Sequence, residues 1–216
     1  MHFALLLPFI PLNETGAKVP ERCLFTLFLI FATFAGSVLV CSRYLVVKKL
    51  LKTDSKNLQL INMISAFFGL ISMASLAGVA AFPVSSVFWC HMMAASVHFV
   101  FAMIYLLVQS YLSFYLNEVP LLVKMLRLLL CLAVVLFLFI LMILFPISYY
   151  RWNAENEFLP AIKKPGDKGF EIVISTALFE WVMYGAYLIY LMSFYLELRE
   201  FNFVIGLVPA TPKPAE

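Results

Sequence analysis

Five long apolar stretches, separated by short polar segments, dominate the chain. Crossing the hydrocarbon core of a bilayer takes about 20 mainly apolar residues in a helix. Five stretches meet that length: residues 23–42, 58–82, 88–116, 125–145 and 169–196. The pattern predicts an all-α, polytopic membrane helix bundle with five full spans, which forms a single unit over residues 1–200. The proline-rich residues 201–216 are expected to form a disordered cytosolic tail.

The composition favours a membrane protein and excludes several other classes. Hydrophobic residues make up 64% of the 216 residues and charged residues 12%, with a mean hydropathy of +0.98. A soluble fold of this size cannot bury so much apolar surface. The net charge of +3 is small and scattered, so it indicates no nucleic-acid partner. Membrane lipids are the expected partners.

Basic residues predict the orientation of the chain. The densest basic cluster follows the first span: Arg43, Lys48, Lys49, Lys52 and Lys56. Loops rich in Lys and Arg stay in the cytosol. We therefore expect a non-cytosolic N-terminus and a cytosolic C-terminus. Under this orientation the sequon at Asn13 lies on the non-cytosolic side, which makes Asn13 a candidate for glycosylation.

Several polar side chains lie inside the apolar spans. Placing a polar group in hydrocarbon costs free energy, so each one indicates a role in function or in helix packing. The third span carries a set on one helical face, at offsets of seven, seven and four residues: His91, His98, Tyr105 and Gln109. A structural seam against neighbouring helices is the favoured interpretation. A ligand-lined or proton-handling face is the alternative.

Glu180 is a charged residue deep within the fifth span, and Trp181 follows it. It lies roughly 15 Å from the non-cytosolic end, and His98 lies at a similar depth. A Glu180–His98 pair would lower the cost of burial. We therefore expect Glu180 to point into the bundle, toward His98, a tyrosine or a serine. A gating or headgroup-binding role is the alternative.

No short motif indicates catalysis. The sequence contains no Walker loop, zinc-protease motif, nucleophile elbow or paired acidic motif, so we expect no catalytic residues, no cofactor and no metal site. Cys23 and Cys90 both fall near the non-cytosolic edge and could form a disulfide. Small residues at four-residue spacing, such as Ser65 and Gly69, favour close packing of the second span within the bundle, with self-association as the alternative.

Segments spread over nearly the whole chain resemble the damage-regulated autophagy modulator (DRAM) family. They are residues 11–16, 20–25, 43–44, 165–170, 180–181 and 193–198. His91, Tyr105 and Gln109 also match the spacing of polar residues in that family. The family has six spans, and residues 1–12 resemble only the tail of the first. The resemblance therefore implies a form that lacks most of the first helix.

The resemblance also implies a function. The expectation is a non-enzymatic, multi-pass protein of lysosomal or endosomal membranes that modulates autophagy and cell death, including apoptosis. More distant relatives imply two alternatives: a factor of membrane-lipid homeostasis or GPI-anchor remodelling in the plasma membrane or Golgi, and a modulator of ion conductance. Other membrane proteins and a second copy of the chain are further expected partners.

Overall fold

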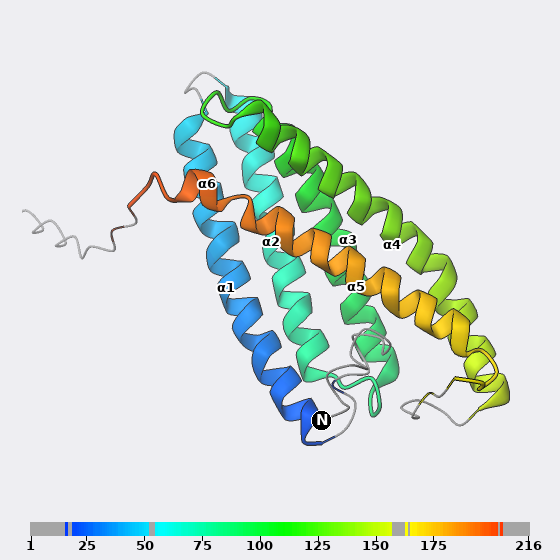
Figure 1. Ribbon diagram of the computed structural model, residues 1–216. Helices are drawn as coiled ribbons and strands as arrows, with labels where there is room; N and C mark the ends of the chain where they lie inside the picture. Colours follow the sequence, from blue (N-terminus) through cyan, green and yellow to red (C-terminus); the bar gives the residue numbers. More distant parts are fainter. Residues whose placement is uncertain are drawn as a thin grey trace, which may run out of the picture.

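The computed structural model describes residues 16, 19–51, 55–156, 163, 165–202 and 204. Within these ranges, five helices are long and apolar enough to cross a membrane. The helices are α1 (Glu21–Leu50), α2 (Lys56–Ala81), α3 (Phe88–Ser113), α4 (Leu121–Glu155), α5 (Phe170–Met192) and the short α6 (Tyr195–Leu198). The predicted all-α class with five long helices is confirmed (Figure 1). Most of the predicted tail lies outside the described residues.

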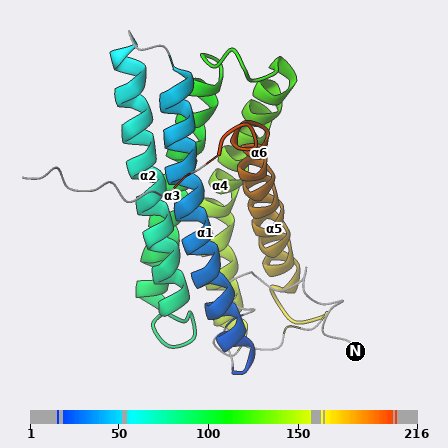
Figure 2. The same cartoon turned by 90° about the vertical axis from the view of Figure 1, so that its left-hand side faces the viewer.

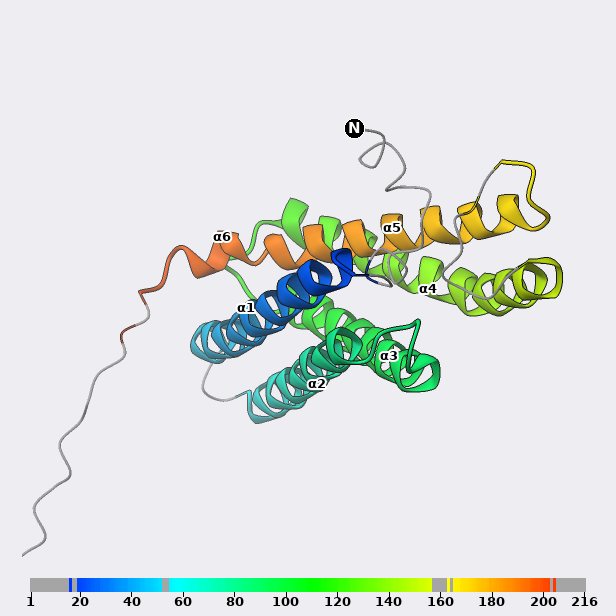
Figure 3. The same cartoon turned by 90° about the horizontal axis from the view of Figure 1, so that it is seen from below.

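The long helices pack mainly on their neighbours in the chain. Helices α1, α2 and α3 run side by side, whereas α4 and α5 form a pair that leans away from them (Figures 1 and 3). After α5, Ser193 and Phe194 keep helical backbone angles, and α6 continues in the direction of α5 and contacts α1 (Figures 1 and 2). Helices α1 and α6 therefore meet at one end of the bundle.

The fourth helix is longer than the sequence indicates. Its predicted span ends at residue 145, just before Pro146, but α4 continues to Glu155 with Pro146 inside it. Membrane helices tolerate an internal proline because neighbouring groups satisfy the carbonyl that the proline frees. Ser148 and Trp152 are buried and extend the packed face beyond the proline.

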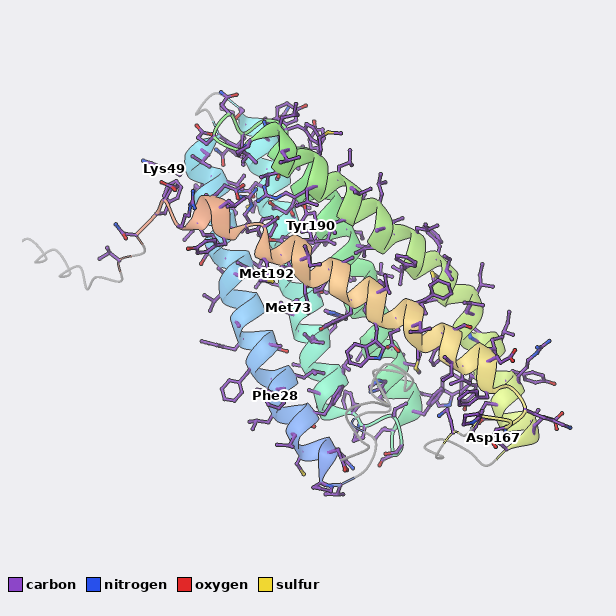
Figure 4. All side chains as sticks on the ribbon, in the orientation of Figure 1. Phe28, Lys49, Met73, Asp167, Tyr190 and Met192 are labelled. Carbon is purple, nitrogen blue, oxygen red and sulfur yellow. The ribbon has the colours of Figure 1, made fainter. Side chains whose placement is uncertain are left out.

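Apolar side chains from several helices form the core. The largest cluster includes Val40 of α1, Met73 of α2, Leu106 of α3 and Tyr190 of α5. The outer faces carry large exposed apolar side chains, such as Phe28, which points away from the bundle (Figure 4). Exposing so much apolar surface to water is unfavourable, whereas in a bilayer the acyl chains cover it.

Helix α2 meets both of its neighbours closely at Gly69. A Cβ atom at this position would lie 2.9 Å from Val40 of α1 and 3.0 Å from Tyr105 of α3. A larger residue therefore requires the helices to shift. Ser65 and Ser72 lie on the same buried side of α2. The small residues of the second span thus pack inside the bundle, as their spacing predicts.

Candidate functional site

Three buried charged side chains lie together where α1, α4 and α6 meet. Arg43 and Arg127 are fully buried, and Glu197 is 5% exposed. The Glu197 carboxylate accepts hydrogen bonds from Arg43 Nη1 at 2.8 Å and from Arg127 Nη1 and Nη2 at 2.7 and 2.6 Å. Arg127 engages both carboxylate oxygens, which is the strongest geometry for such a pair. We call these three side chains the Arg–Glu cluster.

Neutral polar groups satisfy further guanidinium hydrogens of the Arg–Glu cluster. Arg43 Nε donates to Gln109 Oε1 at 3.1 Å, and Gln109 Nε2 donates to Ser65 Oγ at 3.1 Å. Arg127 Nε donates to the hydroxyl of Ser193, and Nη2 donates to the carbonyl of Ser193, both at 2.8 Å. The hydrogen bonds therefore connect α1 and α4 with α2, α3 and the turn after α5.

Two arginines against one glutamate leave the cluster with one excess positive charge. The ring of Phe194 faces both guanidinium groups, with its centroid 4.5 Å from Arg43 Cζ and 5.0 Å from Arg127 Cζ. The hydroxyl of Ser113 accepts hydrogen bonds from the same two groups, at 3.4 and 3.1 Å. An aromatic face and a hydroxyl oxygen both attract a cation. These contacts stabilise the excess charge.

The Arg–Glu cluster has the properties of a structural clamp. Desolvation of each buried ion costs several kcal/mol, which close hydrogen bonds to several partners can offset. Arginine stays protonated in proteins, so neither guanidinium can transfer a proton. The charged groups bind one another and their neighbouring helices, so the cluster joins α1, α3, α4 and α6.

The predicted polar face of α3 is buried among other helices: His91, His98, Tyr105 and Gln109. His91 Nδ1 lies 2.6 Å from the carbonyl of Phe82, and His98 Nδ1 lies 2.9 Å from the carbonyl of Ser72. A carbonyl only accepts, so Nδ1 carries the proton in both rings. The His98 contact holds α3 to Ser72 of α2. The His91 contact holds α3 to Phe82, the residue that follows α2. Gln109 joins the same face to the Arg–Glu cluster.

Glu180 points into the bundle, as predicted, but not toward His98. It is 7% exposed and lines a cavity of about 290 Å³ between α3, α4 and α5, while Trp181 beside it is half-buried. His98 Nδ1 contacts Ser72, and Nε2 has no hydrogen-bond partner in the described part of the chain. The predicted Glu180–His98 pair is wrong because His98 faces α2, whereas Glu180 faces the cavity.

The predicted disulfide is also wrong. Cys23 and Cys90 are both free and exposed. They lie on α1 and α3. Asn13 lies outside the described residues, and its glycosylation stays a prediction.

The charge pattern does not predict the Arg–Glu cluster, because it places Arg43 in the basic cytosolic loop. A usable signal is present. Arg43 lies seven residues before the end of α1, and Arg127 lies six residues after the start of α4. Both positions fall inside apolar helices at the same end of the bundle. Glu197 follows α5 at that end and supplies the opposite charge.

Five long apolar helices and apolar outer faces, with the buried polar groups bonded inside the bundle, define a polytopic helical membrane protein. The family model described as the Frag1/DRAM/Sfk1/Cwh43P N-terminal domain matches residues 2–201. The chain belongs to this family, and the resemblance to its DRAM members is confirmed.

The named relatives are autophagy modulators. The chain is 31% identical over 108 residues to DNA damage-regulated autophagy modulator protein 1 of Homo sapiens, which covers 50% of this chain and 45% of that protein. It is 29% identical over 201 residues to DNA damage-regulated autophagy modulator protein 2 of Rattus norvegicus. This match covers 89% of this chain and 73% of the rat protein. The match thus spans about half of the human protein's length. No solved structure gives a significant match.

Proposed function

We propose that this chain is a non-enzymatic, multi-pass protein of lysosomal or endosomal membranes that modulates autophagy and cell death. Membership of the Frag1/DRAM/Sfk1/Cwh43P family, together with similarity to proteins named as DNA damage-regulated autophagy modulators, carries the proposal. The family match extends over residues 2–201, so it includes all the helices described above.

The buried polar groups support a role exerted through the shape of the bundle. Residues of the Arg–Glu cluster bond to one another and to neighbouring helices. The histidines of α3 bond to backbone carbonyls. Groups held in this way fix helix positions, and a fixed surface can recruit or regulate other membrane components.

Expression of a C-terminally tagged chain in cells that lack the native protein tests the proposal. We expect the tag to colocalise with lysosomal or endosomal markers, and autophagic flux to rise, measured as accumulation of an autophagosome marker when lysosomal degradation is blocked. A protein confined to the Golgi or plasma membrane that leaves flux unchanged contradicts the proposal. That result favours the lipid-homeostasis alternative.

The variant Glu180→Gln separates a structural from an active role of this carboxyl. Glutamine keeps the shape and one acceptor, so the variant should reach the same membrane in normal amounts and support normal flux. Equal abundance with lost flux would assign Glu180 a proton- or headgroup-sensing role instead. Immunoblots of the tag provide the abundance for this comparison.

A further inference from the structure

A cavity opens on the outer surface between α3, α4 and α5, where the α4–α5 pair leans away from the other helices (Figure 1). Its lining side chains come from residues 92–100, 138–146 and 176–183. The lining therefore follows each helix for about eight residues, which is about 12 Å along a helix axis. The cavity is thus an elongated space that runs along the helices, and we call it the slot.

The slot runs from near one surface of the membrane to about its midplane. It begins at Met92, about 6 Å from the start of α3, and ends at Val100, about 18 Å from that start. Half of the hydrocarbon core is about 15 Å thick. Between the slot and the start of α3, Trp89 is exposed, and Phe88 stacks on Tyr149 of α4 with 4.9 Å between the ring centroids. Aromatic rings gather at the level of the lipid headgroups, so the slot lies at the depth of the acyl chains.

We propose that the slot binds one acyl chain of a phospholipid from the leaflet at the end of the bundle where α3 begins. A methylene group takes about as much space as one water, about 30 Å³, so the volume of about 290 Å³ holds about ten methylenes. In a stretched chain each C–C bond advances the chain by about 1.25 Å, so ten methylenes measure about 12 Å. The volume and the length of the slot therefore agree for a single extended chain, whereas a fused-ring body such as a sterol is wider.

The lining gives such a chain apolar contacts along its length. Phe99, Leu141 and Met183 line the slot, and the flexible thioether of a methionine adapts to a mobile chain. The hydroxyl of Thr176 already donates a hydrogen bond of 2.7 Å within α5. Glu180 also lines the slot, but its side chain already has interactions within the protein. An acyl chain needs no polar partner, so it leaves these groups as they are.

The slot is continuous with the outer face that lipid covers. Val100 of α3 and Met142 of α4 line it and are both exposed on that face. A chain from the surrounding bilayer can therefore enter sideways. An apolar space left empty loses the dispersion contacts of its lining atoms, and a chain that fills it restores them. The site is independent of the proposed role in autophagy.

The test uses the purified full chain in phosphatidylcholine nanodiscs. The probe is a phosphatidylcholine with a photoreactive diazirine at the end of one acyl chain, added at increasing mole fraction, and mass spectrometry measures the label on each peptide. A single site fills, so labelling of residues 92–100 and 176–183 should level off. The exposed face of α1 around Phe28 and Phe31 meets bulk lipid, so its labelling should rise in proportion to the probe.

Two matched pairs of variants test the opening of the slot. Val100 lines it and is 39% exposed, whereas Val97 is 36% exposed on the same helix and does not line it. With the probe below saturation, Val100→Trp should lower labelling of residues 176–183 about tenfold, and Val97→Trp should leave it unchanged. Met142→Trp, with Ile143→Trp as its control, repeats the comparison on α4 if Val100→Trp does not fold.

Three results would overturn the proposal. The first is labelling of the slot that rises in proportion to the probe, as on α1. The second is equal labelling in the two variants of a matched pair. The third is saturable labelling of the slot by a photoreactive sterol at mole fractions where the phospholipid probe does not label it.

Discussion

At the scale of single residues, Glu197 has the largest expected effect. Its carboxylate pairs with both Arg43 and Arg127, so Glu197→Gln leaves two buried guanidinium groups without a carboxylate. We expect the variant to lose about 3–5 kcal/mol of stability. Thermal unfolding of the purified protein in detergent measures the loss. Because the cluster joins four helices, cellular abundance should fall as well.

Glu200 provides the matched control for Glu197. It follows α6, is 67% exposed and contacts Arg199 at 3.1 Å. A surface pair of this kind contributes about 0–1 kcal/mol, so Glu200→Gln should be nearly neutral. Equal losses for the two glutamine variants would show that the carboxylate of Glu197 is not a structural centre.

Gln109 tests the link between the predicted polar face and the Arg–Glu cluster. Gln109→Leu keeps the size of the side chain but removes the acceptor for Arg43 Nε and the donor to Ser65. A buried polar group left without its partner costs about 1–3 kcal/mol, so the abundance of the variant should fall. Leu107→Ala, on the exposed side of α3, should lower abundance less. Similar losses would contradict the assignment of faces.

At the scale of elements, the apolar pattern predicts the five long helices well, because each must be apolar along its full length to cross a bilayer. It fails at the end of α4. Pro146 usually ends a helix in water, but in this bundle α4 continues and buries Trp152. Tertiary packing decides this boundary, and packing is not visible in a local pattern.

Gly69 offers a test of helix packing. Gly69→Ala places a methyl group 2.9 Å from Val40 and 3.0 Å from Tyr105, so α1 and α3 must move apart from α2. Overpacking of this kind costs about 1–3 kcal/mol, measurable as a lower unfolding temperature. A Cβ at Gly185 in α5 meets nothing within 4 Å. Gly185→Ala should therefore be neutral or stabilise by up to about 1 kcal/mol. The opposite ranking would refute the close approach at Gly69.

At the scale of the whole molecule, part of the candidate site can be predicted and part cannot. The spacing of His91, Tyr105 and Gln109 indicates one buried face, because a single helix fixes their relation. The partners of that face come from other helices. The similar depth of Glu180 and His98 in the membrane suggests that they pair. The orientation of α3 about its axis instead directs His98 to Ser72 of α2. Arg43, Arg127 and Glu197 are far apart in sequence, so their meeting depends on how α1, α4 and α6 pack together.

The orientation of the molecule stays a prediction with a direct test. Lys49 and Asp167 lie at opposite ends of the bundle (Figure 4). The basic loop after α1 places the end with Lys49 and α6 in the cytosol. External protease should therefore remove a C-terminal tag from sealed vesicles in which the cytosolic face points outward. Protection of the tag in vesicles whose cytosolic markers are digested would contradict this orientation.

During biosynthesis, the two arginines of the Arg–Glu cluster are made well before the glutamate that pairs with them. Arg43 precedes Glu197 by 154 residues and Arg127 precedes it by 70. At ribosomal speed, α1 enters the membrane on the order of ten seconds before its carboxylate is synthesised. During that interval the long Arg43 side chain can extend to the nearby aqueous surface, since it lies close to the end of its helix. A nascent chain thus completes its charge pairing only when α6 is made, and a chain that stalls before Glu197 exposes two unpaired arginines to the quality-control machinery of the membrane.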